Sequence, residues 1–201
     1  MFKKFAAEAF GLSDIGVIVP PTDYDKVDAD DYLFHEDHEK IFFLIKSKKD
    51  EYCFTNLSFI HVDGDSAVSS KRSIRRYPWG AYSVHGVSIE TAGTIDLDVE
   101  LKFSIGETRL SIDVRKSFLE ALKDIYKALT SIGHLQAREG KAREHAFHCS
   151  TVIGSMYKIN AADPEAVTRQ YMSLLDALNT AVIDRHTTRD FGSVFEKYIH
   201  A

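Results

Sequence analysis

Four cations fall within six residues of a chain that carries 25 Lys+Arg against 30 Asp+Glu. They lie in the stretch KRSIRRYPWG at residues 71–80. Such a cluster can grip a phosphate, lie on an anionic membrane, or pair with carboxylates of the same or a neighbouring chain. In a β-strand, successive side chains point to opposite faces. Lys71 and Arg75 then share one face and Arg72 and Arg76 the other, so the four do not converge on one phosphate without a bulge.

A row of acids offers the nearest complementary charge. Residues 95–103 alternate apolar and charged side chains, which predicts a strand with one buried and one solvated face. We expect the cations to pair with this row, within one subunit or across an interface; solvated charges and an external anion remain open as alternatives. An exposed pair contributes only about 0–1 kcal/mol, so pairing would set register and partner choice more than stability. The predicted interaction surface comprises Lys71, Arg75, Arg76, Asp96, Asp98 and Glu100.

A second group has the spacing of a metal site. His145, His148 and Cys149 stand at i, i+3 and i+4 of a predicted helix, with His186 or His134 as a distant fourth ligand. However, Cys149 lies in the apolar stripe of that helix, and one helix rarely supplies three ligands. A core or interface role is therefore favoured, and no metal is predicted.

Motifs for nucleophilic catalysis and phosphate binding are missing from the sequence. No serine lies in a G-x-S-x-G elbow, and neither Cys53 nor Cys149 has a context that would lower its pKa. G-x-G-x-x-G does not occur. The stretch HEDHEK, residues 35–40, is interpreted as a hydrated loop. We expect no enzymatic activity and no cofactor.

Bulk composition is that of a globular protein: 201 residues, 44% hydrophobic and 27% charged, with a net charge of −5. No apolar run approaches the roughly 18 residues that cross a bilayer. The start of the chain does not read as a secretory signal, because its apolar residues are spaced as in a short amphipathic helix. Two cysteines are too few for a disulfide framework. These features predict a cytoplasmic protein that binds neither nucleic acid nor, in the favoured interpretation, membranes.

Alternation of period two dominates the middle of the chain. It predicts seven strands joined by short turns, at residues 41–47, 51–56, 57–64, 67–77, 83–89, 93–103 and 109–114. Because no crossover helix separates them, the strands should form an antiparallel sandwich or barrel. A helical stripe over residues 118–129 follows and would close the open end. The stretch 20–31 has no period and is predicted to be a loop.

Helical periodicity continues to the end of the chain, after a break at Gly133 and Gly140. Apolar stripes over 142–156 and 167–182 flank a turn in which Asp163 is placed to cap the second helix. They predict an antiparallel hairpin, with residues 191–199 as a last short helix or docking tail. Two helices alone have too little core to be stable. The hairpin therefore needs a partner, either the barrel or another subunit.

Three short segments resemble the bacterial pleckstrin-homology-like (PH-like) domain family. They are Glu90-Thr91-Ala92-Gly93, Asp96-Leu97-Asp98 with Glu100-Leu101, and the upstream RRYPW at 75–79. The resemblance covers residues 1–130, and 134–201 are similar to a helical-hairpin extension found after such domains. It implies a PH-like fold, no known catalytic activity, and cyclic homo-oligomers whose polar surface engages proteins. It does not imply a phosphoinositide site, because the first hairpin offers only Lys46, Lys48 and Lys49, followed at once by Asp50 and Glu51.

The predicted fold is α+β: a PH-like seven-stranded antiparallel barrel or sandwich closed by a C-terminal helix, then an antiparallel helical hairpin. The expected domains are 1–132 and 133–201. The predicted function is a non-enzymatic scaffold that forms a homo-oligomeric ring and binds an unidentified protein through its polar inter-subunit surface. The alternative is a module that binds anionic ligands or membrane surfaces through the basic strand 71–76.

Overall fold

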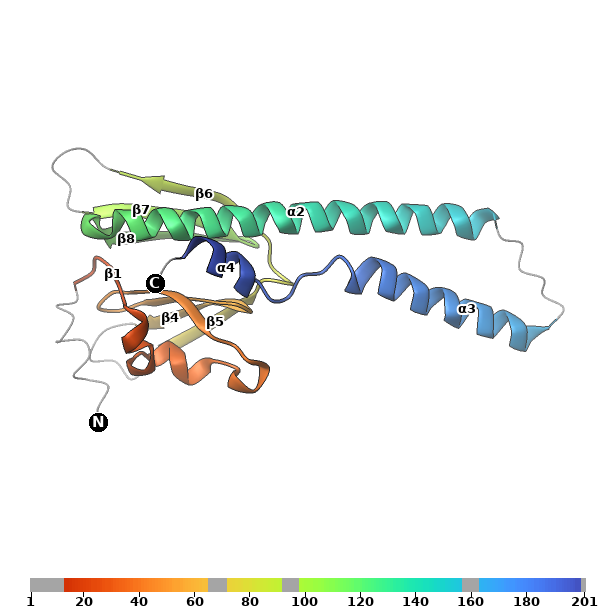
Figure 1. Cartoon of the computed structure of the whole chain (residues 1–201), viewed down its shortest axis with the longest axis horizontal. Coiled ribbons are helices and arrows are strands. Elements are labelled where there is room, and N and C mark those ends of the chain that lie inside the picture. The colour runs from red at the N-terminus through yellow and green to blue at the C-terminus, as the bar shows by residue number, and fades with distance from the viewer. Residues whose placement is uncertain (1–12, 65–71, 92–97, 157–162, 200–201) are drawn as a thin grey trace. The chain divides into compact units, whose positions relative to one another are not determined.

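Two antiparallel sheets form the first part of the molecule (Figure 1). The computed structural model describes residues 13–64, 72–91, 98–156 and 163–199. One sheet has the strand order β1-β2-β3-β4-β5 and the other β6-β7-β8. The strands are β1 (Val17–Ile18), β2 (Ile41–Lys46), β3 (Glu51–Thr55), β4 (Ser58–Gly64), β5 (Arg72–Pro78), β6 (Val84–Glu90), β7 (Asp98–Ile105) and β8 (Thr108–Arg115). The amphipathic helix expected at the N-terminus lies outside the described residues.

The two sheets meet along one edge and are separate along the other. Gly16 donates its N–H to the Asp113 carbonyl at 2.7 Å, and Arg115 donates to the Gly16 carbonyl at 3.0 Å. Within the described ranges, no strand ladder joins β5 to β6. The prediction of a closed seven-stranded barrel is thus corrected: β1 was missed, and the sheet is not closed.

Alternating apolar residues fill the space between the sheets, as the period predicted. Val99, Leu101, Phe103 and Ile105 are all buried on one face of β7. The Phe103 ring lies 5.4 Å from that of Phe59 across the two sheets. Helix α2 adds the apolar stripe predicted to close the core, with Leu122, Ile125 and Leu129 fully buried.

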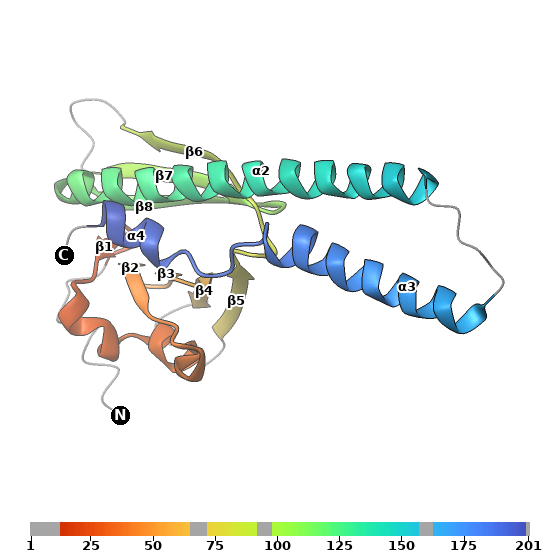
Figure 2. The same ribbon diagram turned by 45° about the vertical axis from the view of Figure 1, so that its right-hand side comes forward.

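Three 3-10 helices cover the other face of the five-stranded sheet, where a loop was predicted. They are η1 (Pro21–Lys26), η2 (Asp28–Tyr32) and η3 (His35–Asp37). Figures 1 and 2 show them on the side of the sheet away from α2. A cluster of buried apolar residues lies beneath them: Val19, Val27, Ala29, Leu33, Leu44, Cys53, Ile60 and Val62. Such short helices lack the 3.6-residue period by which a sequence reveals a helix.

Helix α2 (Leu119–Met156) is continuous for 38 residues after the short η4 (Lys116–Phe118). The prediction that Gly133 and Gly140 break the helix was wrong. A Cβ at Gly133 would lie 2.5 Å from the Val84 carbonyl oxygen, whereas at Gly140 the nearest atom would be 3.9 Å away. Gly133 therefore allows α2 to approach β6 closely, and it does not end the helix.

The chain divides into two compact units, Met1–Gly133 with Arg189–Ala201, and His134–Thr188. The predicted split at 132/133 places the last segment in the helical extension, whereas the structure groups it with the sheets. There, α4 (Gly192–Tyr198) stacks the Phe195 ring on that of Phe42, with centroids 5.4 Å apart. Phe191 and Phe195 are fully buried, so the apolar tail predicted at 191–199 docks as a short helix.

The second unit contains the distal part of α2, then α3 (Pro164–Leu178) and the π-helical turn η5 (Asn179–Asp184). Asp163 caps α3 as predicted, accepting hydrogen bonds from the N–H groups of Glu165 and Ala166. The chain returns to the middle of α2, where Arg143 donates to the His186 carbonyl and Glu139 accepts from Thr188. In the described part of the chain, no helix combines the length and apolar character needed to cross a bilayer.

Candidate interaction surface

Arg76, on β5, is the centre of a largely buried polar network. Its Nη1 donates to both carboxylate oxygens of Glu39, at 2.8 and 2.9 Å, and to Ser58 Oγ at 2.6 Å. Its Nη2 donates to the Tyr32 carbonyl, and its guanidinium lies 4.1 Å from the centre of the Phe34 ring. Arg76 thus fastens the segment between η2 and β2 to the sheet.

Glu39 is the acid of this network, and its side chain is fully buried. Burial opposes its ionisation. Hydrogen bonds from the Phe34 N–H, Ser58, Thr55 and Arg76 outweigh burial, so the pKa of Glu39 lies below its usual value. Glu39 is therefore a charged residue whose partners are all supplied by the protein itself.

Arg72 acts at the other end of β5. It forms an ion pair with Asp28 in η2. Arg72, Ile74 and Arg76 lie on the same face of β5, as the strand alternation predicted. Two of the four clustered cations thus bind carboxylates of the segment that covers this face.

Arg75 points to the opposite face, which looks toward the three-stranded sheet. It pairs across the strands with His61, and its neighbour Tyr77 pairs with Phe59, which contacts Phe103. Its side chain is 52% exposed, and its nearest carboxylate, Asp63, is 3.9 Å away. Arg75 is therefore available for a contact outside the chain.

His61, which pairs with Arg75 across the strands, has an acid of its own nearby. His61 Nε2 lies 3.1 Å from Asp50, and its ring stacks on Tyr52 with centroids 4.7 Å apart. Burial, followed by the charges of Asp50, Asp63 and Asp113, raises the pKa of Tyr52 above its usual range.

The acidic row on β7 lies in the other sheet. Glu100 accepts hydrogen bonds from Lys102 and Ser111, which lower its pKa. Burial, and then the charges of Glu100 and Asp98, raise the pKa of Asp113 on β8. At Asp113, the negative charges of Glu100 and Asp98 therefore outweigh the positive charge of Lys102.

The structure keeps the two halves of the predicted surface apart. Arg75 and Arg76 are neighbours on β5, and Asp98 and Glu100 lie on β7 in the second sheet. In the regions described, the ion pairs of Arg75 and Arg76 go to Asp63 and Glu39, not to the acidic row. The expectation of pairing between these two strands within one subunit is corrected accordingly. Lys71 and Asp96 lie outside the described residues.

Sequence reasoning missed Glu39, which was assigned to a hydrated loop. No local signal marks it, because HEDHEK is polar throughout and the partner Arg76 is 37 residues away. Of the three residues that have the spacing of a metal site, Cys149 has its Sγ 3.9 Å from His145 Nε2, and the cysteine is exposed. No cluster of three metal-ligating side chains occurs among the residues with described positions.

Two antiparallel sheets with a helix closing the core define a PH-like fold. The chain belongs to the family described as "Bacterial PH domain", which matches residues 9–132. It is 48% identical over 203 residues to "Uncharacterized protein YvbH" of Bacillus subtilis (strain 168), covering 100% of both chains. The crystal structure of a PH-domain-containing bacterial protein from Exiguobacterium sibiricum 255-15 is 46% identical, with a TM-score of 0.80, covering 92% of this chain and 100% of that chain. The family resemblance read from the sequence is confirmed, and the similarity extends through the C-terminal helices.

Proposed function

We propose that this protein is a non-enzymatic PH-like scaffold that assembles into a homo-oligomeric ring and recruits a protein partner. The recruiting surface lies between subunits and uses Lys71, Arg75, Arg76, Asp96, Asp98 and Glu100. Arg76 holds β5 in place through its hydrogen bonds to Glu39, and Arg75 makes the contact with the neighbouring subunit.

The observation that carries the proposal is the position of Arg75. It is a half-exposed cation on β5, a strand at the edge of its sheet, and it is only loosely paired with Asp63. Edge strands present unpaired backbone groups that favour contact with another chain. Glu100 and Asp98 supply a negative surface elsewhere on the same molecule. Charge complementarity across an interface sets partner choice and orientation.

A contact from Arg75 of one copy to Glu100 of the next joins two different surfaces. Such a head-to-tail contact is heterologous, and it closes into a ring when the rotation between copies allows. This geometry supports a cyclic assembly over a two-fold dimer for the PH-like unit. A third protein would then contact the polar seam where two subunits meet.

Sedimentation velocity of the purified full chain at micromolar concentration tests the assembly. We expect a discrete oligomer that Arg75→Glu reduces in size and that the double variant Arg75→Glu/Glu100→Arg restores, because the charges are exchanged. Arg109→Glu, at an exposed arginine of β8 that is outside the proposed surface, is the matched control and should leave the assembly intact. A wild type that sediments as a clean monomer removes the ring.

Binding of an anionic ligand through the basic strand has less support, because Arg72 and Arg76 already bind Asp28 and Glu39. Flotation with anionic vesicles at low and physiological salt separates the two functions. At low salt exposed charges are least screened. The scaffold proposal expects no flotation at either salt, and strong flotation that Arg75→Glu abolishes would favour the anionic ligand instead.

A further inference from the structure

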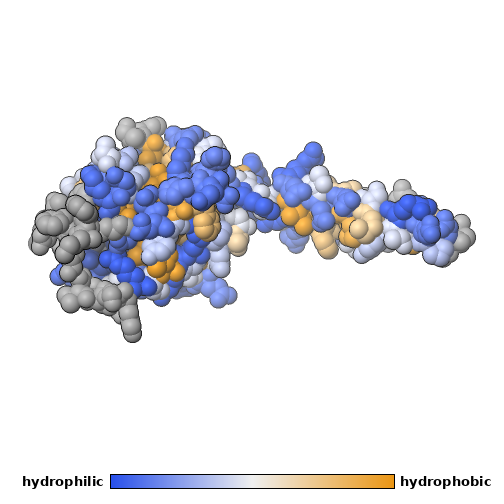
Figure 3. Space-filling view, turned by 90° about the horizontal axis from the view of Figure 1, so that it is seen from below, coloured by the Kyte–Doolittle hydropathy of each residue, from blue (hydrophilic) through white to orange (hydrophobic). Residues whose placement is uncertain are grey.

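Three large apolar side chains are exposed on the side of the five-stranded sheet that carries the 3-10 helices. Tyr32, Phe34 and Ile74 are 39%, 50% and 38% exposed. Tyr32 ends η2 and Phe34 precedes η3, while Ile74 lies on β5 on the same face as Arg76. Figure 3 views the molecule from the side on which these helices lie in Figure 1, and it shows apolar patches among hydrophilic surface. Exposed apolar surface rimmed by polar residues marks a site of interaction.

The buried network of Arg76 holds the two aromatic residues in this exposed position. Glu39 accepts a hydrogen bond from the Phe34 N–H at 2.8 Å, and the Phe34 carbonyl accepts from the N–H groups of Asp37 and Glu39 at 3.0 and 3.1 Å. The Arg76 guanidinium donates to the Tyr32 carbonyl and lies over the Phe34 ring. Groups that are fixed before binding lose less entropy when a partner binds. Tyr32 and Phe34 are therefore preorganised anchors.

An excess of acid surrounds these anchors. Residues 21–39 contain eight Asp+Glu and a single Lys. Ion pairs within the protein neutralise three of these acids, and the cations are Lys26, Arg72 and Arg76. Five acids then remain in excess. Glu36 and Asp37 in η3 are exposed, and neither belongs to an ion pair between described residues.

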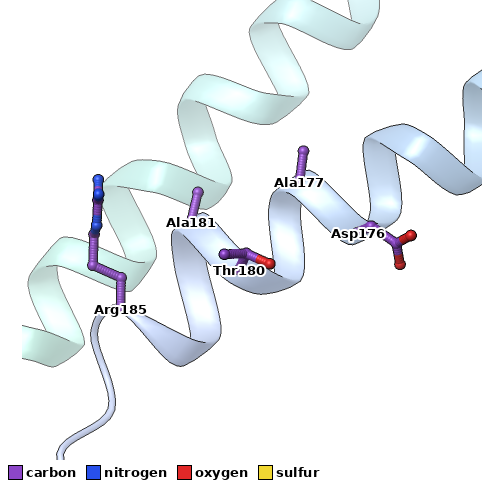
Figure 4. Close-up of a pocket in the computed structure, with 5 residues that line it drawn as sticks. All are labelled: Asp176, Ala177, Thr180, Ala181 and Arg185. Carbon is purple, nitrogen blue, oxygen red and sulfur yellow. The ribbon is translucent and has the colours of Figure 1, made fainter.

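A groove on the second unit offers a contrast. It has a volume of about 390 Å³ and is lined by Asp176, Ala177, Thr180, Ala181 and Arg185. Figure 4 shows Ala177 and Ala181 pointing to the same side of the helix, between Asp176 at one end and Arg185 at the other. One acid and one cation balance there, so charge selects no ligand for this groove. Around Phe34, by contrast, the excess of acid selects a positively charged partner.

We propose that Tyr32, Phe34, Ile74, Glu36 and Asp37, together called the Phe34 face, bind a basic and apolar segment of another protein. The apolar side chains of the segment cover the two aromatic residues and Ile74. Its Lys or Arg side chains lie against Glu36 and Asp37, and a cation also gains from contact with an exposed aromatic ring. Complementary charge determines which partner binds and in which orientation.

This site goes beyond the proposed scaffold function and does not depend on a ring. Arg75 points to the opposite face of β5, because side chains alternate along a strand. A segment bound at the Phe34 face therefore leaves Arg75 open for its contact with a neighbouring subunit.

Fluorescence anisotropy of labelled synthetic peptides, added to the full chain, tests the site. The probe is a short peptide in which lysines are interspersed with leucine and phenylalanine. One control peptide has Glu in place of each Lys, and another has Ser in place of each Leu and Phe. The probe should bind more tightly than either control. Its affinity should fall from low to physiological salt, because exposed charges are then more strongly screened.

Variants of the full chain locate the bound peptide. Glu36→Lys and Asp37→Lys should each weaken binding of the probe about threefold or more, because each replaces an attraction by a repulsion. Phe34→Ala should weaken it about fivefold or more, as truncation of an anchor does. Ile74→Thr keeps a β-branched side chain in the strand and should also weaken binding without touching the Arg76 network. Glu107→Lys, at an exposed acid in the turn between β7 and β8, is the matched control and should keep the wild-type affinity.

Equal affinities of Glu36→Lys, Ile74→Thr and Glu107→Lys for the probe would overturn the site, because the peptide would then respond only to the net charge of the protein. Tighter binding of the acidic peptide, or no binding of the probe at low salt, would overturn it as well. A loss of mass of Ile74→Thr in sedimentation velocity would assign the face to a second copy and equally refute the proposal. A monomeric wild type that binds the probe at this face would remove the ring and leave the Phe34 face in place.

Discussion

Arg76→Ala should lower the free energy of unfolding of the first unit by about 3 kcal/mol, because removal of one partner leaves a buried charge uncompensated. Glu39 is fully buried and Arg76 is 20% exposed, so solvent screens their pair little. The value lies at the low end of the range for buried pairs, since the Phe34 N–H, Thr55 and Ser58 still donate to Glu39 in the variant.

Urea unfolding followed by the fluorescence of Trp79 measures this loss. Trp79, the single tryptophan, is 1% exposed, and its indole N–H donates to the Thr55 carbonyl at 2.9 Å, next to the network. With a slope of about 1–3 kcal/mol/M, the midpoint should fall by roughly 1–3 M while the slope is unchanged. All variants must be compared at one protein concentration, because the proposed self-association would shift the midpoint.

Arg75→Ala is the matched control on the neighbouring residue. Arg75 is half exposed and 3.9 Å from Asp63, so its removal should cost no more than about 0.5 kcal/mol. Glu39→Gln combined with Arg76→Ala should cost less than the sum of the single changes, with a coupling of at least about 1 kcal/mol. Equal midpoints for Arg76→Ala and Arg75→Ala, or additive costs in this cycle, would refute the network.

Acid should remove the contribution of Glu39. Its pKa is lower in the folded than in the unfolded protein. The stabilisation is therefore present above the unfolded pKa and is lost as the pH falls through the folded pKa. The difference in stability between wild type and Glu39→Gln should shrink across that window, and a difference that grows on acidification would contradict the assignment.

Two further predictions concern α2 and the acidic row. Gly133→Ala should destabilise the protein by about 1–3 kcal/mol because the added Cβ would lie 2.5 Å from the Val84 carbonyl oxygen, while Gly140→Ala should stabilise it by up to about 1 kcal/mol. Thermal unfolding of the pair checks this, and equal shifts would contradict it. Asp113→Asn should be more stable than wild type at pH 7, because burial and the charges of Glu100 and Asp98 raise the Asp113 pKa on folding. Urea midpoints should converge as the pH falls below the unfolded aspartate value, and a gain that persists there would have another cause.

The sequence predicts elements whose burial follows a regular period. Strand β7 shows this most clearly, since Val99, Leu101 and Phe103 alternate with charged residues on the solvated face. β1 escaped prediction because two residues carry no period. Gly133 was wrongly predicted to break the helix. A glycine is needed there because the backbone of Val84, which is distant in the sequence, lies close to it.

The candidate surface was predictable only in part, for a related reason. Strand alternation correctly placed Arg72 and Arg76 on one face and Arg75 on the other. It could not supply their partners, because Asp28 and Glu39 come from a segment without periodicity. Residue types indicate which charges can pair, but tertiary contacts decide which of them remain available.

Ion pairs within the protein limit what the arginines of β5 can bind. For Arg76 to bind an external phosphate, it would have to leave Glu39, whose buried carboxylate would then lose its charged partner. A phosphate at Arg72 would likewise compete with Asp28. Among the described residues of the cluster, the exposed cation that remains is Arg75, which lies close to Asp63. One cation beside an acid is a poor anion site, whereas a single charge can set the register between two protein chains. The pairing of Arg72 and Arg76 within the protein therefore weighs against the anion-binding module that the arginine-rich sequence suggests, and it supports the proposed contact with another protein.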